Sequence, residues 1–158
     1  MTLPTYWLKA GTQYNLHSPY LFGMYNELLY ARLPKATRQR LQLRTVPRKE
    51  RQYCELLYKF AVHYKPDVVL LRDITDPHAL RCLHEAREHV TVKPLVNESE
   101  DCRLLLHGTG DIALVRNPRG RLKDNNGHSV TLDMYHTGVV LYTRKLAPQH
   151  LLLKGWGW

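Results

Sequence analysis

Residues 68–80, VVLLRDITDPHAL, constrain the fold of this chain more than any other stretch. The four apolar residues Val68–Leu71 predict a buried strand, and Thr75 or Asp76, followed by Pro77, predicts the cap and first turn of a helix. In many α/β enzymes the junction between such a strand and helix carries glycines and binds a phosphate or a cofactor. Residues 72–77 contain no glycine, so the sequence predicts the scaffold of such a site without its usual loop.

The sequence on either side predicts helices before this strand and more strands after it. Helices are expected to begin at Ser18-Pro19 and at Pro47, because apolar residues then recur at helical spacing. Strands are expected at residues 90–96, 111–115, 130–134 and 139–143, the first of them an edge strand or strand end because it contains Pro94. The expected fold class is α/β, with a small, partly parallel sheet, flanking helices and a helical N-terminus. We expect one domain over residues 1–158, with a helical, basic extension at 1–46 and a reduced α/β core at 47–158.

The composition narrows the class of protein. The chain is 44% hydrophobic, which is ordinary for a globular domain, and its apolar runs are too short to cross a bilayer. The first residues lack the long apolar segment of a signal peptide, and the three cysteines lack Cys-x-x-Cys spacing. We therefore expect a cytoplasmic protein with reduced thiols and no membrane association. The nine histidines show no metal-ligand spacing, so no metal site is expected.

Positive charge is concentrated in the first part of the chain. Residues 1–65 contain 11 Lys or Arg and 3 Asp or Glu, a net charge of +8, whereas the net charge of the whole chain is +9. Anions bind to such a surface with release of counterions. We predict that nucleic acid or an acidic protein surface binds at Lys35, Arg38, Arg40, Arg44, Arg48, Lys49 and Arg51. The alternative is a solvated connector that only keeps the protein soluble.

Three stretches resemble a known family. The N-terminal YWLKAGTQYNLHSPYLFGMYNELL is similar to the aromatic-rich helix and the His-Ser-Pro-aromatic turn that open a group of bacterial class I S-adenosylmethionine-dependent methyltransferases. CELLYKFAVHYKPDVVLL resembles the helix that leads into their first core strand, and SVTLDMYHTGVVLYTRKLAPQHLLL resembles their final two strands. The resemblance implies a reduced, methyltransferase-like (Rossmann-like) fold.

The chain departs from this family where the cofactor would bind. The resemblance places Leu71 where the first strand of the family ends in an acid, and Asp73 where its first glycine stands. Lys93 falls where the second strand carries the carboxylate that binds the ribose hydroxyls, and Arg116 falls where a later strand carries an Asp. Both cations would oppose a positively charged sulfonium. The degenerate positions of the cofactor site are thus Asp73, Lys93 and Arg116, and no catalytic residue is expected.

These departures favour a non-catalytic binding or regulatory module that has no cofactor and uses its basic part on an anionic partner. One alternative is an active S-adenosylmethionine-dependent methyltransferase with an atypical cofactor loop. Another is a pseudoenzyme subunit that docks on an active homologue through the aromatic residues Trp7, Tyr14, Tyr20, Phe22 and Tyr25. For His17 in the His-Ser-Pro turn we expect a hydrogen bond at the start of the helix rather than catalysis.

Overall fold

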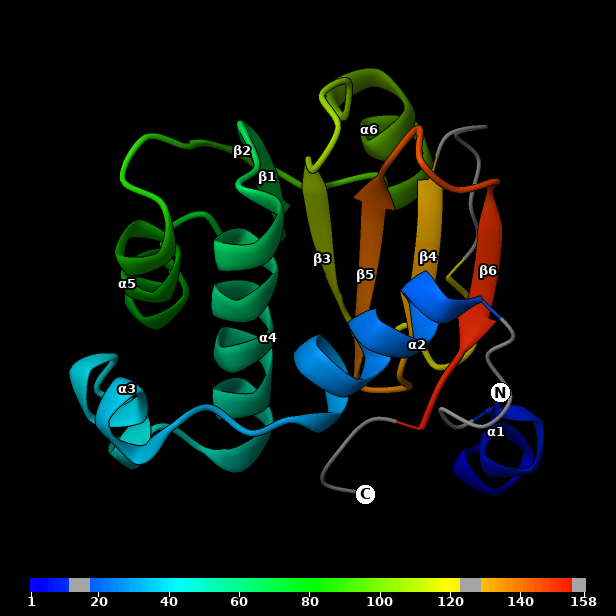
Figure 1. Ribbon diagram of the computed structural model, residues 1–158, viewed down its shortest axis with the longest axis horizontal. Helices are drawn as coiled ribbons and strands as arrows, with labels where there is room; N and C mark the ends of the chain where they lie inside the picture. Colours follow the sequence, from blue (N-terminus) through cyan, green and yellow to red (C-terminus); the bar gives the residue numbers. More distant parts are fainter. Residues whose placement is uncertain (12–17, 123–128, 155–158) are drawn as a thin grey trace.

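The computed structural model describes residues 1–11, 18–122 and 129–154 (Figure 1). A six-stranded sheet forms its centre, built from β1 (Val68–Leu71), β2 (Thr91–Pro94), β3 (Ile112–Arg116), β4 (Ser129–Asp133), β5 (Thr137–Tyr142) and β6 (Gln149–Leu152). The order across the sheet is β2-β1-β3-β5-β4-β6. β1 pairs in parallel with β2 and β3, β4 pairs in parallel with β6, and β5 is antiparallel to both of its neighbours. The sheet is therefore mostly parallel, which confirms the predicted α/β fold class.

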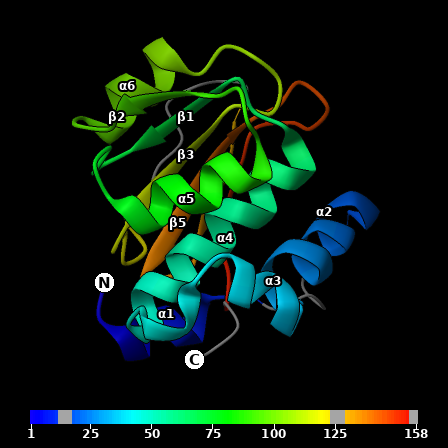
Figure 2. The same ribbon diagram turned by 90° about the vertical axis from the view of Figure 1, so that its left-hand side faces the viewer.

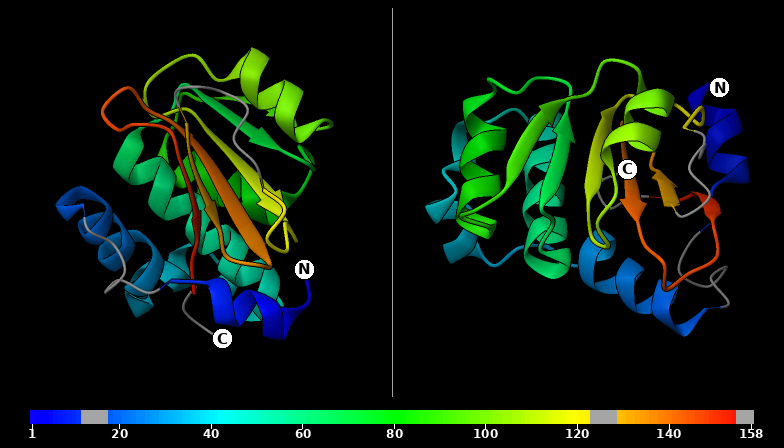
Figure 3. Two further views of the ribbon diagram at one scale, coloured as in Figure 1. Left: turned by 90° about the vertical axis from the view of Figure 1, so that its right-hand side faces the viewer. Right: turned by 90° about the horizontal axis from the view of Figure 1, so that it is seen from above.

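Helices cover both faces of this sheet, as Figure 3 shows from above. One face is covered by α2 (Pro19–Met24), which continues as the π-helical η2 (Tyr25–Tyr30), and by α4 (Arg48–Tyr64) and α5 (Pro77–Ala86). The other face is covered by α6 (Glu98–Leu105). α1 (Leu3–Lys9) lies near the end of β6, and α3 (Lys35–Arg40) and η3 (Leu43–Thr45) precede α4. Strands that alternate with helices on two faces are compatible with a Rossmann-like fold.

The helix ends follow the signals in the sequence. Ser18 is the N-cap of α2 and accepts a hydrogen bond from Leu21 N at 3.5 Å, with Pro19 at the first helical position. Pro47 precedes α4, and Lys65 ends that helix in a left-handed conformation with φ of 48°. β2 is an edge strand, as its proline predicted.

The core divides into two clusters on the two faces of the sheet. In the larger cluster Leu57 and Phe60 of α4 are fully buried together with Val69 and Leu71 of β1. The smaller cluster lies between the sheet and α6 and includes Leu70 of β1. β1 is therefore buried on both faces, as expected for a parallel strand between helical layers.

Candidate functional site

The carboxyl ends of β1, β2 and β3 meet at one edge of the sheet. From β1 the chain passes through α5 to β2 on one side, and it then crosses the other face through α6 to reach β3. The strand order therefore reverses between β1 and β3, and open α/β sheets bind their ligands at such a point. The segments that follow these strand ends are residues 72–76, 95–97 and 117–121.

The segment after β1 is held by its own side chains. Asp73 Oδ1 accepts hydrogen bonds from Thr75 Oγ1 at 2.7 Å and Thr75 N at 2.9 Å, and these bonds hold the pKa of Asp73 below its usual value. Asp76 is the N-cap of α5 and accepts hydrogen bonds from two backbone N–H groups of its first turn. None of residues 72–76 has a positive φ, so this backbone does not make the close turn of a glycine loop.

Arg116, at the end of β3, forms an ion-pair cluster with residues of α4 and α5. Its Nη1 lies 2.5 Å from Glu50 Oε2, and its Nη2 lies 3.1 Å from Asp76 Oδ2. Its guanidinium carbon lies 3.9 Å from the centre of the Tyr53 ring. This cluster bridges the end of β3 and the segment after β1. The two carboxylates more than offset the single charge of Arg116, so this cluster does not repel a cation as the sequence had suggested.

Lys93 lies half-buried on the edge strand β2. In the sheet register it is opposite Leu70, which belongs to the cluster under α6. Residues in register on neighbouring strands point to the same face, so Lys93 lies on the α6 face. An ammonium group there cannot accept a hydrogen bond from a ribose hydroxyl.

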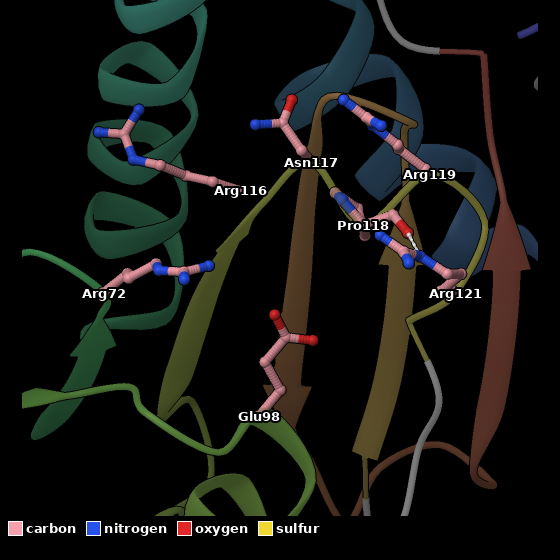
Figure 4. A pocket seen from close by; sticks show the side chains of 7 residues that line it. All are labelled: Arg72, Glu98, Arg116, Asn117, Pro118, Arg119 and Arg121. Carbon is pink, nitrogen blue, oxygen red and sulfur yellow. Dashed lines mark hydrogen bonds between the residues drawn. The ribbon is translucent and has the colours of Figure 1, made fainter. Parts of the chain in front are cut away.

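A pocket of about 570 Å³ opens at the same strand ends (Figure 4). Its described lining residues are Arg72, Glu98, Arg116, Asn117, Pro118, Arg119 and Arg121, and we call it the arginine pocket. Arg72 follows β1, Glu98 begins α6, and the others belong to the end of β3 and the loop after it. Among these described residues Glu98 is the only carboxylate. Because Arg116 is already paired, Arg72, Arg119 and Arg121 supply the net positive charge of the pocket.

The loop that carries two of these arginines has an uncommon backbone conformation. Asn117 and Arg119 have φ of 52° and 53°, in the left-handed region that residues other than glycine seldom adopt. Asn117 N donates to His136 O at 2.8 Å, and Arg119 N donates to Tyr135 O at 2.9 Å. Such conformations persist only where neighbouring contacts determine them, and they cluster at ligand sites.

Asp133 links this loop to the turn between β4 and β5. Its Oδ1 accepts a hydrogen bond from Tyr135 N at 2.9 Å, and its Oδ2 accepts one from Leu122 N at 3.3 Å. Asp133 is fully buried, and burial raises the pKa of its carboxyl group. Tyr6 of α1 donates its hydroxyl to the carbonyl oxygens of Asp133 and Leu153. Buried contacts therefore hold the backbone that presents the arginines.

The basic residues predicted from the sequence lie on α3, on η3 and on the first turn of α4. Leu41, Leu43 and Val46 are buried and hold this segment against the domain. A second pocket of about 300 Å³, which we call the α3 pocket, is lined by Lys35, Arg38, Gln39, Leu43, Arg44 and Arg51. The structure thus brings together four of the seven predicted cations.

The other three predicted cations do not line the α3 pocket. Arg40 forms an ion pair with Glu85 of α5, with 3.4 Å between Nε and Oε2. Arg48 and Lys49 are exposed on the first turn of α4. Arg72, Arg119 and Arg121 were not among the predicted residues, although the turn that contains Arg119 was predicted from Asn117-Pro118-Arg119-Gly120.

The aromatic residues predicted for docking do not share one exposed surface. Tyr25 is buried and donates its hydroxyl to Lys154 O at 2.6 Å, and the Trp7 ring lies 5.0 Å from Lys154 Nζ. Tyr20 and Phe22 on α2 are exposed. Tyr14 and His17 lie outside the described residues.

No family model, curated protein or solved structure matches this chain. Within residues 1–11, 18–122 and 129–154, no group of three or more His, Cys, Asp or Glu side chains could hold a metal ion. In the same part of the chain, no helix has the length and apolar character needed to cross a membrane.

Proposed function

We propose that this protein is a non-catalytic, methyltransferase-like module that binds an anionic group in the arginine pocket. The observation that carries this proposal is that Arg72, Arg119 and Arg121 line one pocket at the strand ends where α/β sheets bind ligands. Guanidinium groups bind phosphate and carboxylate oxygens through paired, charge-assisted hydrogen bonds. The ligand therefore carries phosphate or carboxylate groups.

The conformation of the 117–121 loop supports this proposal. Its backbone is held by hydrogen bonds to residues 135 and 136, so Arg119 and Arg121 do not depend on a ligand for their backbone positions. A loop that already has its bound conformation loses less conformational entropy on binding. A loop backbone that is fixed before binding favours a specific anion site over a diffuse basic surface.

The same strand ends offer little to S-adenosylmethionine. The segment after β1 lacks glycine, and Asp76 is engaged both as a helix cap and as a partner of Arg116. Lys93 stands where a ribose-binding carboxylate would be needed. These features support the proposal that this fold has lost its cofactor site and its catalytic activity.

A cytoplasmic location fits the cysteines. Cys54, Cys82 and Cys102 are all buried and free. Disulfides are rare in the cytosol because its reductants keep thiols reduced. We therefore propose a cytoplasmic protein whose stability does not depend on disulfides.

Isothermal titration calorimetry with pyrophosphate tests the anion site. The parent protein should bind pyrophosphate, and the triple variant Arg72→Gln, Arg119→Gln, Arg121→Gln should bind at least about 100-fold more weakly. The reason is that each hydrogen bond to a charged group contributes about 1.5–3 kcal/mol.

A charge-matched variant, Arg81→Gln, Arg144→Gln, Lys145→Gln, is the control. These three residues are exposed and do not line the arginine pocket. The control should keep the parent affinity for pyrophosphate. Equal weakening in both variants would show that only net charge matters, and a parent protein that does not bind pyrophosphate would refute the site.

A further inference from the structure

The first turn of α4 lies between the arginine pocket and the α3 pocket. Arg116 lines the arginine pocket and forms an ion pair with Glu50 on that turn. Arg51, the next residue, lines the α3 pocket. The two pockets therefore lie on either side of this turn, where Glu50 shares the single positive charge of Arg116 with Asp76.

A second observation also places the first turn of α4 close to the arginine pocket. His136 lies beside the loop of the arginine pocket, with its Nδ1 3.5 Å from Asn117 Oδ1. Partial burial and the nearby charges of Lys49 and Arg119 lower the pKa of His136. The charges of Lys49 on α4 and of Arg119 in the arginine pocket therefore both act on this half-exposed imidazole.

Two cationic pockets on either side of one helical turn fit a chain of repeated negative charges better than a single small anion. We propose that the ligand is a single-stranded nucleic acid whose phosphates bind in the arginine pocket, pass the first turn of α4 and bind again in the α3 pocket. This inference rests on the anion binding proposed above and specifies its ligand. Of the basic residues that line the two pockets all but Lys35 are arginines, and their planar guanidinium groups match phosphate geometry.

The placement of the pockets favours a single strand over a duplex. The arginine pocket includes the start of α6 and the α3 pocket includes α3, and Figure 2 shows α6 and α3 on opposite sides of the sheet. Duplex DNA has a persistence length of about 50 nm, so it resists bending around a single helix. A single strand bends freely and can follow the first turn of α4 from one pocket to the other.

Fluorescence anisotropy with labelled oligonucleotides tests this inference. The probes are single-stranded polyuridylates of about 4, 8 and 16 nucleotides, the range of site sizes in single-strand-binding folds. We expect the affinity to rise with probe length. The logarithm of the binding constant should fall with the logarithm of salt concentration, by about 0.7 per phosphate neutralised.

Two pocket variants and one control locate the path. The arginine-pocket triple variant should weaken binding of the longest probe and flatten the salt slope by about 2, and Lys35→Gln, Arg44→Gln should flatten it by about 1.4. The control Arg81→Gln, Arg144→Gln, Lys145→Gln should bind like the parent. All of these replaced side chains are exposed, so all four proteins should melt at closely similar temperatures.

The outcomes separate this inference from the anion site itself. If the Lys35→Gln, Arg44→Gln variant binds the longest probe like the parent, while the triple variant loses pyrophosphate, the anion site stands and the path is refuted. If a duplex binds as tightly as the single strand, or polyglutamate of matched charge displaces the probe equally well, the assigned ligand class is wrong. If the parent binds neither pyrophosphate nor any probe, both proposals fail.

Discussion

Replacement of Phe60 by alanine should lower the free energy of unfolding by about 3–5 kcal/mol, as truncation of large buried side chains does. Phe60 is fully buried in α4, and its ring stacks on Tyr64 with 5.6 Å between the ring centres. It belongs to the core cluster that also contains Val69 and Leu71 of β1. Because β1 leads directly to Arg72, the cavity left by the ring would also weaken the support of the candidate site.

Denaturation in urea measures this effect. Val62→Ala on the same helix is the matched control, because Val62 is 45% exposed and its truncation should change the free energy of unfolding by less than about 0.5 kcal/mol. If Phe60→Ala unfolds at the same urea concentration as Val62→Ala, α4 does not pack on the sheet as described.

The second large effect is a rise of stability with pH that depends on Lys59. Lys59 is 6% exposed, and burial lowers the pKa of its ammonium group to about 8, against the opposing effect of Glu55. Its Nζ donates to the carbonyl oxygens of Leu28 and Ala31. Above pH 8 the folded protein loses this proton, whereas the unfolded chain keeps it until about pH 10.5. The unfolded state binds this proton more tightly in this range, so Lys59 by itself should add about 2 kcal/mol of stability between about pH 7.5 and 9.5.

Urea denaturation at both pH values, compared between the parent and Lys59→Arg, isolates this contribution. Arginine stays charged throughout, so the variant should lack the rise. Burial raises the pKa values of Tyr6, Tyr53 and Tyr64, and the hydrogen bond to Cys82 together with burial raises that of Cys54. These groups reduce stability as the pH rises, Cys54 from about pH 8.5 and the tyrosines as the pH approaches about 10. Both proteins contain all four groups, so their effect cancels in the difference. A parent that gains no stability over the variant would contradict a buried Lys59 with a lowered pKa.

Most of the fold follows from local patterns in the sequence. α4 was predicted because apolar residues recur at helical spacing between Pro47 and Pro66, and β1 because four apolar residues follow. β6 was not predicted as a strand, because its polar Gln149-His150 start carries no strand signal and it forms only by pairing with β4. The π-helical hydrogen bonds of η2 were not predictable either, because an ordinary α-helix has the same spacing of apolar residues.

The candidate site was predictable only in part. The loss of the glycine loop is visible in residues 72–77, because glycine is the residue that such a loop requires. The shared pocket of Arg72, Arg119 and Arg121 was not predictable, since these residues are distant in the chain and line one pocket only because β3 pairs with β1. Arg116 was correctly placed at the end of a strand, but its carboxylate partners come from α4 and from the N-cap of α5.

Calorimetric titration with S-adenosylmethionine tests most directly whether these strand ends have lost the ability to bind the cofactor. We expect no binding tighter than about 1 mM, which corresponds to about 4 kcal/mol, under conditions in which pyrophosphate binds measurably. The missing glycines, the Arg116 cluster and Lys93 all lead to this result. Micromolar binding of S-adenosylmethionine would contradict it and would support an active methyltransferase with an atypical cofactor loop.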